Sequence, residues 1–221
     1  MTHIIVINPN TSDATTAMMT GIVRRLLPAG ITADGMTAAS GVPMILNGLQ
    51  LAASVASVKD MGLAAAPRTN GIIIGAFGDP GLEDLRQLLD IPVCGLFESS
   101  VLQAVEAGQR FGIATVTPDL VASFSQKAAA LKASSFFTGT RLTQGDPLSL
   151  ARDPIQLKAA LSIAAKQCVD QDGAEVVIIG GGPLGEAASE LRRELSIPII
   201  APITSAVKSL IRMINDHTNA S

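Results

Sequence analysis

Short continuous apolar runs alternate along the chain with longer stretches in which apolar residues recur at helical spacing. Continuously apolar strands are typical of parallel sheets that helices cover on both faces, and the alternation is typical of βαβ units. The pattern therefore predicts the α/β class. The expected strands are residues 4–7, 31–33, 71–74, 92–96, 111–114, 135–138, 176–179 and 198–201. The expected helices are residues 13–27, 46–65, 82–89, 100–110, 120–131, 155–170, 184–195 and 205–215.

Four residues mark expected helix starts. Ser12 and Asp119 stand where N-caps would accept hydrogen bonds from the free backbone N–H groups of a first turn. Pro80 and Pro183 suit first helical turns, where a missing N–H group costs nothing.

Three segments of the first half recur in the second half at offsets of 105 to 107 residues. Any two βα units share some of this pattern, but three matches in one order favour a duplicated architecture. The matching pairs are residues 3–10 with 110–117, 71–78 with 176–183, and 91–101 with 197–207.

The repeat predicts two pseudo-symmetric α/β lobes, each a parallel sheet flanked by helices. We place the first lobe at residues 1–97 and the second at residues 98–205, with the last helix, about residues 206–221, returning to the first lobe. Ligands bind beyond the carboxyl ends of strands in open parallel sheets, so we expect the site in a cleft between the lobes.

The net charge of the chain and the lengths of its apolar runs exclude two classes of binding partner, nucleic acids and membranes. The 221 residues include 16 basic and 19 acidic ones, for a formal net charge of −3, and no Lys/Arg block exceeds two residues. Nucleic acid and membrane surfaces are therefore not expected partners. The apolar runs end at Gly or Pro well short of the roughly 18 residues of a membrane span, and no secretory signal opens the chain. We expect a cytoplasmic protein.

Cysteine and histidine usage excludes several chemistries. Cys94 and Cys168 stand in apolar contexts, so we expect both to be reduced, buried and structural, although Cys94 lies near a strand end. His3 and His217 lie near opposite ends of the chain, so the sequence predicts no metal site and no Ser/His/Asp triad. The glycines of residues 180–182 lack the spacing of a nucleotide-binding motif.

Four loops that run from a strand end into a helix start carry the candidate site. They pair across the repeat as residues 8–12 with 115–119 and residues 75–81 with 180–185. Free N–H groups and the positive end of a helix dipole favour an anion there, and Ser, Thr and Asn side chains add donors. A small carboxylate or imide-like molecule is the expected guest, and the alternative is that these residues are ordinary caps and turns.

The strings Asn8-Pro-Asn-Thr-Ser12 and Phe77-Gly-Asp-Pro-Gly81, together with the repeat, resemble the aspartate/glutamate racemase superfamily, in particular its hydantoin and allantoin racemase branch. The resemblance covers nearly the whole chain. It implies a cofactor-independent racemase or isomerase that acts at the carbon next to a carbonyl of a small polar acid or cyclic ureide. It also implies a homo-oligomer.

In that family two cysteines, one after the third strand of each lobe, exchange the proton, and the resemblance places them at Ala76 and Gly181. Neither residue transfers protons. The remaining candidate bases are Asp79 and Glu98, unless Asp79 caps a helix and Glu98 is solvated. Because Glu98 matches Thr204 in the repeat, one-face chemistry such as decarboxylation or isomerisation is one alternative. A lapsed enzyme that binds a small ligand without turnover is another.

The resemblance also implies a set of substrate contacts made by small polar groups and backbone. These are Asn10, Phe77, Gly78, Thr115, Thr117 and Gly182, with Pro43 and Met44 as weaker candidates. Phe77 stands where the amino-acid racemases carry a small hydroxyl residue, which favours a flatter or more apolar ligand than free aspartate or glutamate.

Overall fold

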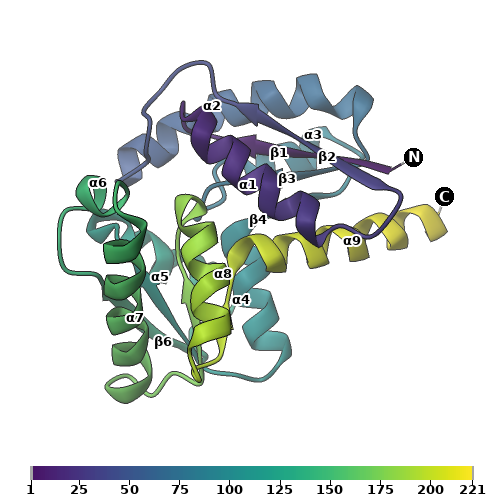
Figure 1. Ribbon diagram of the computed structural model, residues 1–221. Coiled ribbons are helices and arrows are strands. Elements are labelled where there is room, and N and C mark those ends of the chain that lie inside the picture. The colour runs from purple at the N-terminus through teal and green to yellow at the C-terminus, as the bar shows by residue number, and fades with distance from the viewer. Residues whose placement is uncertain (1, 221) are drawn as a thin grey trace. The chain divides into compact units, whose positions relative to one another are not determined.

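The computed structural model describes residues 2–220, apart from the side chains of residues 218 and 220 (Figure 1). The strands are β1 (Thr2–Asn8), β2 (Ile31–Thr37), β3 (Gly71–Ile74), β4 (Val93–Gly95), β5 (Phe111–Thr115), β6 (Phe137–Leu142), β7 (Val176–Ile179) and β8 (Ile199–Ile200). The α-helices are α1 (Asp13–Leu26), α2 (Gly48–Ala65), α3 (Leu82–Leu88), α4 (Leu96–Glu106), α5 (Val121–Ala130), α6 (Pro147–Leu150), α7 (Pro154–Asp170), α8 (Gly185–Glu194) and α9 (Pro202–Ala220). Short 3-10 helices cover Ala66–Arg68, Pro118–Leu120 and Gly182–Leu184.

The strands form two four-stranded sheets, ordered β2-β1-β3-β4 and β6-β5-β7-β8, and every neighbouring pair is parallel. The two orders correspond strand by strand. The predicted α/β class, with two parallel sheets flanked by helices, is therefore confirmed.

The chain divides into two compact units. The first comprises the chain up to Ile45, Leu49–Ser99 and the chain from Ile203 onward, and the second comprises Leu46–Gly48 and Ser100–Pro202. Most of α9 belongs to the first unit, and a Cβ on Gly71 of β3 would lie 2.9 Å from a methyl of Leu210 in that helix.

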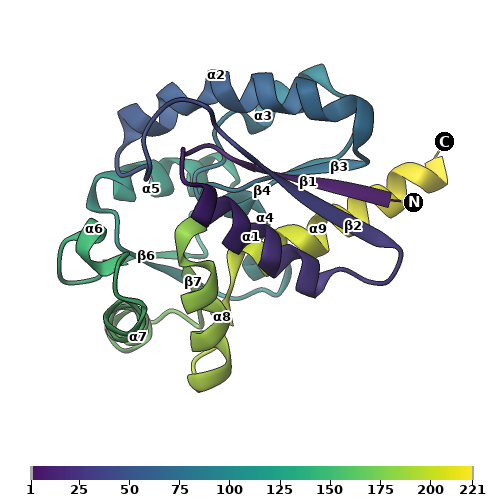
Figure 2. The same cartoon turned by 45° about the horizontal axis from the view of Figure 1, so that its top comes forward.

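The first sheet is buried between two pairs of helices. Ile5, Ile7, Ile72 and Ile74 share one face and join a core with α2 and α3. Alternate strand residues point to the other face, where Cys94 of β4 meets Met213 of α9. Figure 2 shows α2 and α3 on one side of this sheet and α1 and α9 on the other. Burial on both faces explains why β3 and most of β1 are continuously apolar, whereas the edge strand β2 is more polar and only partly buried.

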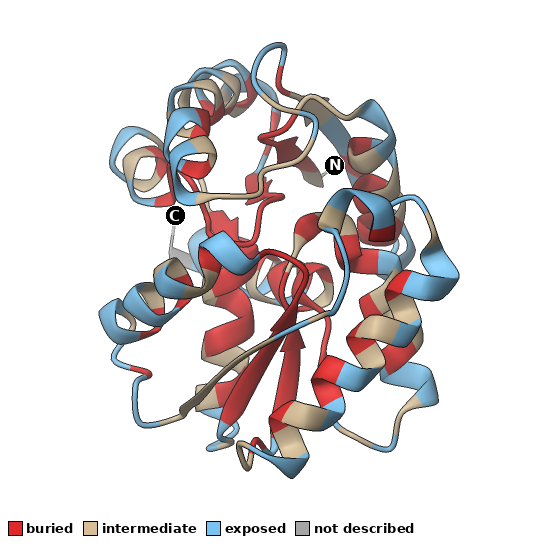
Figure 3. Ribbon diagram, turned by 90° about the vertical axis from the view of Figure 1, so that its left-hand side faces the viewer, coloured by how far each residue is buried: buried red, intermediate tan, exposed pale blue. Residues whose placement is uncertain are grey.

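The second sheet has the same layered organisation. The helix α7 packs against β5, β6 and β7, and a Cβ on Gly112 of β5 would lie 2.8 Å from Cys168 of α7. In Figure 3 the central strands β5 and β7 are buried, the edge strand β6 is mostly intermediate, and the helices alternate buried and exposed residues. The amphipathic helices therefore cover the apolar central strands in both units, whereas the edge strands β2 and β6 carry polar residues.

Several predicted boundaries were wrong. The strand β2 continues to Thr37 because it pairs with β1 in register along its whole length. The strand β6 begins at Phe137, and the short helix α6 was not predicted. The helix α4 begins at Leu96, inside the predicted strand.

The expected helix starts had mixed outcomes. Ser12 caps α1 as predicted and accepts a hydrogen bond from Thr15 N at 3.2 Å. Asp119 is not an N-cap, because it lies inside the 3-10 helix that follows Thr117. Pro80 precedes α3, which begins after Gly81 at a φ of 73°, whereas Pro183 does occupy the first turn of a 3-10 helix.

Candidate functional site

The first sheet reverses its strand order between β1 and β3. The next strand beyond β1 is β2, and the next beyond β3 is β4, so the connections leave in opposite directions. A crevice forms at such a switch point, beyond the carboxyl ends of the two central strands. The loops after β1 and β3, which hold Asn10 and residues 75–81, leave the sheet there.

The loop after β1 is held by a buried asparagine. The Asn8 side-chain nitrogen donates to Asn10 Oδ1 and to Thr16 Oγ1, both at 2.9 Å. Asn10 Oδ1 also accepts from Ser12 N at 2.9 Å. These bonds occupy the oxygen of the Asn10 amide, whereas its nitrogen has no acceptor among residues 2–220. The amide nitrogen of Asn10 is thus an oriented donor at the strand end.

The loop after β3 is a tight, glycine-dependent turn. Gly75 N donates to Ile7 O at 2.7 Å and continues the sheet, and Asp79 N donates to Ala76 O at 3.1 Å. Gly78 has a φ of 145°, which favours glycine. The methyl group of Ala76 is buried at this turn.

Phe77 contributes its ring to the core of the first unit. The ring is 4% exposed and packs edge-on against Phe97, with centroids 5.1 Å apart. Because the ring is engaged in this contact, its predicted role in shaping the ligand stays a prediction.

The Asp79 carboxylate is committed to the start of α4. Its two oxygens accept hydrogen bonds from Phe97 N at 2.9 Å and from Glu98 N at 2.8 Å. A carboxylate at a helix N-terminus satisfies free N–H groups and complements the helix dipole. Asp79 therefore acts as a cap contributed from a distant part of the chain, with both oxygens engaged, rather than as a free carboxylate.

Glu98 is paired with Arg86. The two guanidinium nitrogens lie 2.9 and 2.8 Å from the carboxylate oxygens, and Arg86 Nε donates to Val93 O at 3.1 Å. Burial works against the charge of Arg86, but the hydrogen bond and charge of Glu98 raise the pKa of the guanidinium. The structure therefore gives Glu98 a bidentate cationic partner.

The second sheet repeats the switch point between β5 and β7. Thr115 Oγ1 donates to Gly180 O at 2.6 Å and lies 3.1 Å from Thr117 Oγ1. Both threonines are buried. The Thr115 hydroxyl ties the end of β5 to the glycine loop after β7, where Gly182 begins a 3-10 helix, and Thr117 contacts that hydroxyl.

The two positions that the resemblance assigns to cysteine differ in their surroundings. Ala76 carries a Cβ already. A Cβ on Gly181 would lie 2.8 Å from Cγ and 2.9 Å from Cδ1 of Leu184, so any side chain there displaces that leucine.

The two cysteines of the chain are free and buried, as predicted. Burial raises the pKa of Cys94 to about 11 and the pKa of Cys168 to about 12. Both thiols are therefore protonated near neutral pH, so neither is a thiolate base.

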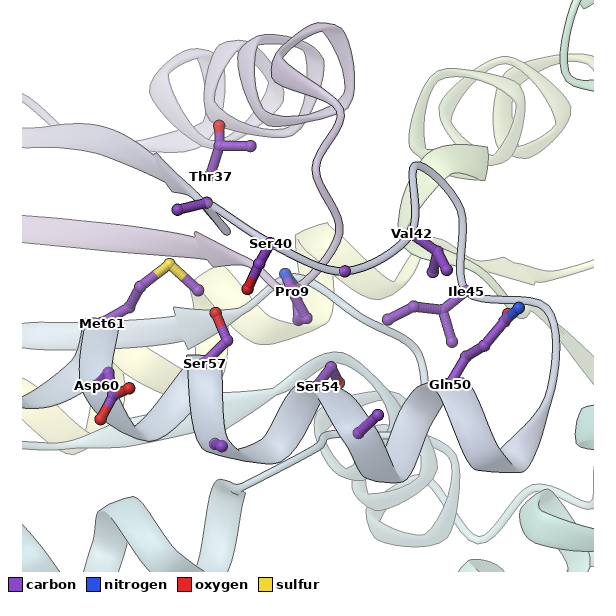
Figure 4. A pocket seen from close by; sticks show the side chains of 14 residues that line it. Pro9, Thr37, Ser40, Val42, Ile45, Gln50, Ser54, Ser57, Asp60 and Met61 are labelled. Atoms are coloured by element: carbon purple, nitrogen blue, oxygen red, sulfur yellow. The ribbon is translucent and has the colours of Figure 1, made fainter.

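The sequence reasoning missed a groove of about 470 Å³ in the first unit, between the loop after β2 and one face of α2 (Figure 4). Its lining comprises Pro9, Thr37, Ala39, Ser40, Gly41, Val42, Ile45, Gln50, Ala53, Ser54, Ala56, Ser57, Asp60 and Met61. The α2 members recur at helical spacing, and this run of small and polar residues on one face was the available signal.

Two further features concern the described part of the chain. Across residues 2–220, no three His, Cys, Asp or Glu side chains gather as a metal site would require. The helices found in that range are all too short or too polar to cross a membrane.

Both units are parallel α/β sheets with polar loops at the switch point, which is where small-molecule sites form in this class of protein. Residues 4–210 match the family model described as Asp/Glu/Hydantoin racemase, so the chain belongs to that family. The predicted family is confirmed. This membership supports an isomerase of the cofactor-independent racemase type.

Curated relatives and solved structures agree with this assignment. The chain is 26% identical over 211 residues to a hydantoin racemase of Paenarthrobacter aurescens, covering 93% of this chain and 88% of that one. It is 33% identical over 146 residues to a hydantoin racemase of Pseudomonas sp. (strain NS671), covering 63% and 56%. An allantoin racemase from Klebsiella pneumoniae superposes with a TM-score of 0.91 at 25% identity, covering 97% and 88%.

Proposed function

We propose that this protein is a cofactor-independent racemase for a cyclic ureide, a ring of the hydantoin and allantoin class. The substrate class is supported by the relatives named hydantoin racemase and by the likeness to an allantoin racemase. The observation that carries the proposal is the amide nitrogen of Asn10, a fixed donor at the strand end that can bind a ring carbonyl.

The chemistry requires loss of a proton from the carbon next to that carbonyl. Donors aimed at the carbonyl oxygen stabilise the enolate that forms and so acidify the carbon. We assign this task to Asn10 and to the backbone of Phe77 and Gly78, and the family resemblance adds Thr115, Thr117 and Gly182 as proposed substrate contacts. These assignments rest on strand-end placement and on the family resemblance.

The chain supplies no thiol at Ala76 or Gly181, and the carboxylates of Asp79 and Glu98 are both engaged by other groups. We therefore propose that a solvent hydroxide ion takes the proton from the acidified carbon, forming water, and that a water molecule then returns a proton and regenerates hydroxide. Return to either face then racemises the ring. Asp79 and Glu98 act in this scheme by holding the loop and the helix start.

A second function is favoured by one specific observation: neither Ala76 nor Gly181 can transfer a proton. A protein that binds the ring and does not turn it over would keep Asn10 and lose both thiols. This function predicts ligand binding without exchange.

Proton NMR in D₂O separates the two functions. Hydantoins substituted at the ring carbon, allantoin and small dicarboxylic acids are incubated with the protein, and the signal of the proton next to the carbonyl is followed against a protein-free sample. Loss of signal with loss of optical activity supports the racemase. Loss of signal with retained configuration indicates one-face chemistry.

Binding without exchange supports the second function, and absence of binding across the panel rules out both. The Asn10→Ala variant should weaken binding by about fivefold to tenfold, which corresponds to one hydrogen bond of about 1 kcal/mol or slightly more. The cytoplasmic location and the homo-oligomer expected from the sequence stay predictions.

A further inference from the structure

The groove beside α2 adjoins the loop that carries Asn10. Pro9, the residue before Asn10, forms part of its lining. The loop after β2, which lines one side of the groove, is hydrogen-bonded to the loop after β1, because Thr11 N donates to Val42 O at 3.0 Å. Asn10 itself does not line this groove of about 470 Å³, so a substituent of a ring bound at Asn10 would reach it past Pro9. Cavities of roughly 300 Å³ and above are in the size range of small-molecule sites.

The lining is mostly apolar, with four hydroxyl groups, of which those of Thr37 and Ser54 are engaged by Thr16 and by the backbone of Leu51. Pro9, Val42, Ile45 and Met61 provide apolar surface, and alanines leave room between them. Figure 4 shows the hydroxyls of Ser40 and Ser57 directed toward one another across the groove. Neither hydroxyl has a hydrogen-bond partner among residues 2–220, so both are open to a ligand.

The charge of the groove is negative. Asp60 lines it, and neither Lys nor Arg does. The neighbouring cation Lys59 is paired with Asp84 at 3.0 Å. A carboxylate on a ligand would therefore meet Asp60 without a compensating cation, whereas an N–H donor would meet an acceptor.

We infer that this groove binds the substituent of the ureide ring and selects substituents that carry N–H donors, such as ureido, amide or ammonium groups, over carboxylates. The inference rests on the proposed function, since that function places the ring at Asn10. It assigns Asp60, Ser40 and Ser57 to specificity and leaves proton exchange to the strand-end loops.

The test measures dissociation constants of five hydantoins by ligand-observed NMR. The probes are the unsubstituted ring and rings that carry ureido, 4-aminobutyl, isobutyl or 2-carboxyethyl groups. The ureido and aminobutyl rings should bind at least about fivefold more tightly than the carboxyethyl ring, as expected for one partly exposed charge interaction. Asp60→Asn should abolish that difference. Asp90→Asn, which removes an exposed carboxylate outside the groove, should leave it unchanged.

Two alanines of α2 provide a steric test. Ala53 lines the groove, and its neighbour Ala52 is exposed outside it. Ala53→Leu should raise the dissociation constants of the ureido and aminobutyl rings at least about fivefold, because the larger side chain fills space that the substituents need. The dissociation constant of the unsubstituted ring should not change. Ala52→Leu should change none of these constants. The inference would be overturned if Ala53→Leu and Ala52→Leu changed the dissociation constants equally. It would also be overturned if Asp60→Asn left the order of the five dissociation constants unchanged.

A second readout separates failure of the groove from failure of the proposed function. The ¹³C-labelled methyl group of Met61, identified by its loss in Met61→Leu, reports on the groove directly. If no hydantoin binds but N-butylurea shifts this signal, the ring site fails and the groove still binds N–H donors. If the unsubstituted ring binds and N-butylurea does not shift Met61, the function stands and the inference fails. Failure of both probes rejects both.

Discussion

The carboxyl group of Asp79 occupies the space that a Cβ on residue 95 would need, so β4 must end in glycine at Gly95. From that place the carboxylate receives the N–H groups of Phe97 and Glu98. The residues of this clamp are 18 and 19 positions apart in sequence. It joins the turn after β3, which includes Ala76, to the first turn of α4.

Gly95→Ala should lower the free energy of unfolding by about 3 kcal/mol, because the methyl group displaces the carboxylate and breaks both hydrogen bonds. Urea unfolding followed by circular dichroism measures the change. In an Asp79→Gly background, which also tolerates the positive φ of 49° at this position, Gly95→Ala should cost at least about 1 kcal/mol less. Gly48→Ala is the control, since a Cβ there meets no atom within 4 Å. Additive costs in the double variant would contradict the clamp.

Arg86→Gln should destabilise the first unit by about 2 kcal/mol, because it leaves the half-buried Glu98 carboxylate without its bidentate partner. Glu83 also approaches Arg86, at 3.4 Å, but its side chain is 75% exposed. Glu83→Gln should therefore cost less than about 0.5 kcal/mol. The same urea titration compares the two variants. Equal losses of unfolding free energy in Arg86→Gln and Glu83→Gln would show that the Glu98 carboxylate does not depend on Arg86.

The buried thiols predict a loss of stability at alkaline pH. The pKa of Cys94 is raised from 9.0 to about 11 and that of Cys168 from 9.0 to about 12, so the folded state retains protons that the unfolded state has released. The stabilising contribution is complete below pH 9.0 and is lost as the pH rises toward about 11 to 12. Unfolding free energies measured across that range should fall less steeply in Cys94→Ala and Cys168→Ala. An unchanged slope in both variants would reject the shifts.

Introducing a cysteine should leave the free energy of unfolding almost unchanged at Ala76 and should lower it at Gly181. Ala76→Cys should change stability by less than about 1 kcal/mol, because a Cβ is already present. Gly181→Cys should cost about 2 kcal/mol, because its Cβ meets Leu184 at 2.8 Å. Combining Gly181→Cys with Leu184→Ala should cost less than the sum of the single changes.

The same variants test the proposed site. If the substrate loops are intact, the double variant Ala76→Cys with Gly181→Cys should racemise hydantoins faster than the parent chain, as followed by polarimetry. Each single variant is the control, since inversion by thiols requires two of them. A folded double variant that still binds hydantoin and gains no activity would argue against the assigned positions.

The sequence by itself determined the α/β class, the duplicated pattern, the strand-end loops and the family. Each of these follows from local features: apolar periodicity, turn residues and short strings such as Asn8-Pro-Asn-Thr-Ser12. Only the tertiary structure decided what the side chains of those loops do. It directed both oxygens of Asp79 to α4, placed Glu98 beside Arg86, and opened a groove along α2. The physical reason is that periodicity records which face of an element is buried, whereas hydrogen-bond partners and cavities depend on the paths of loops that bring residues distant in sequence together.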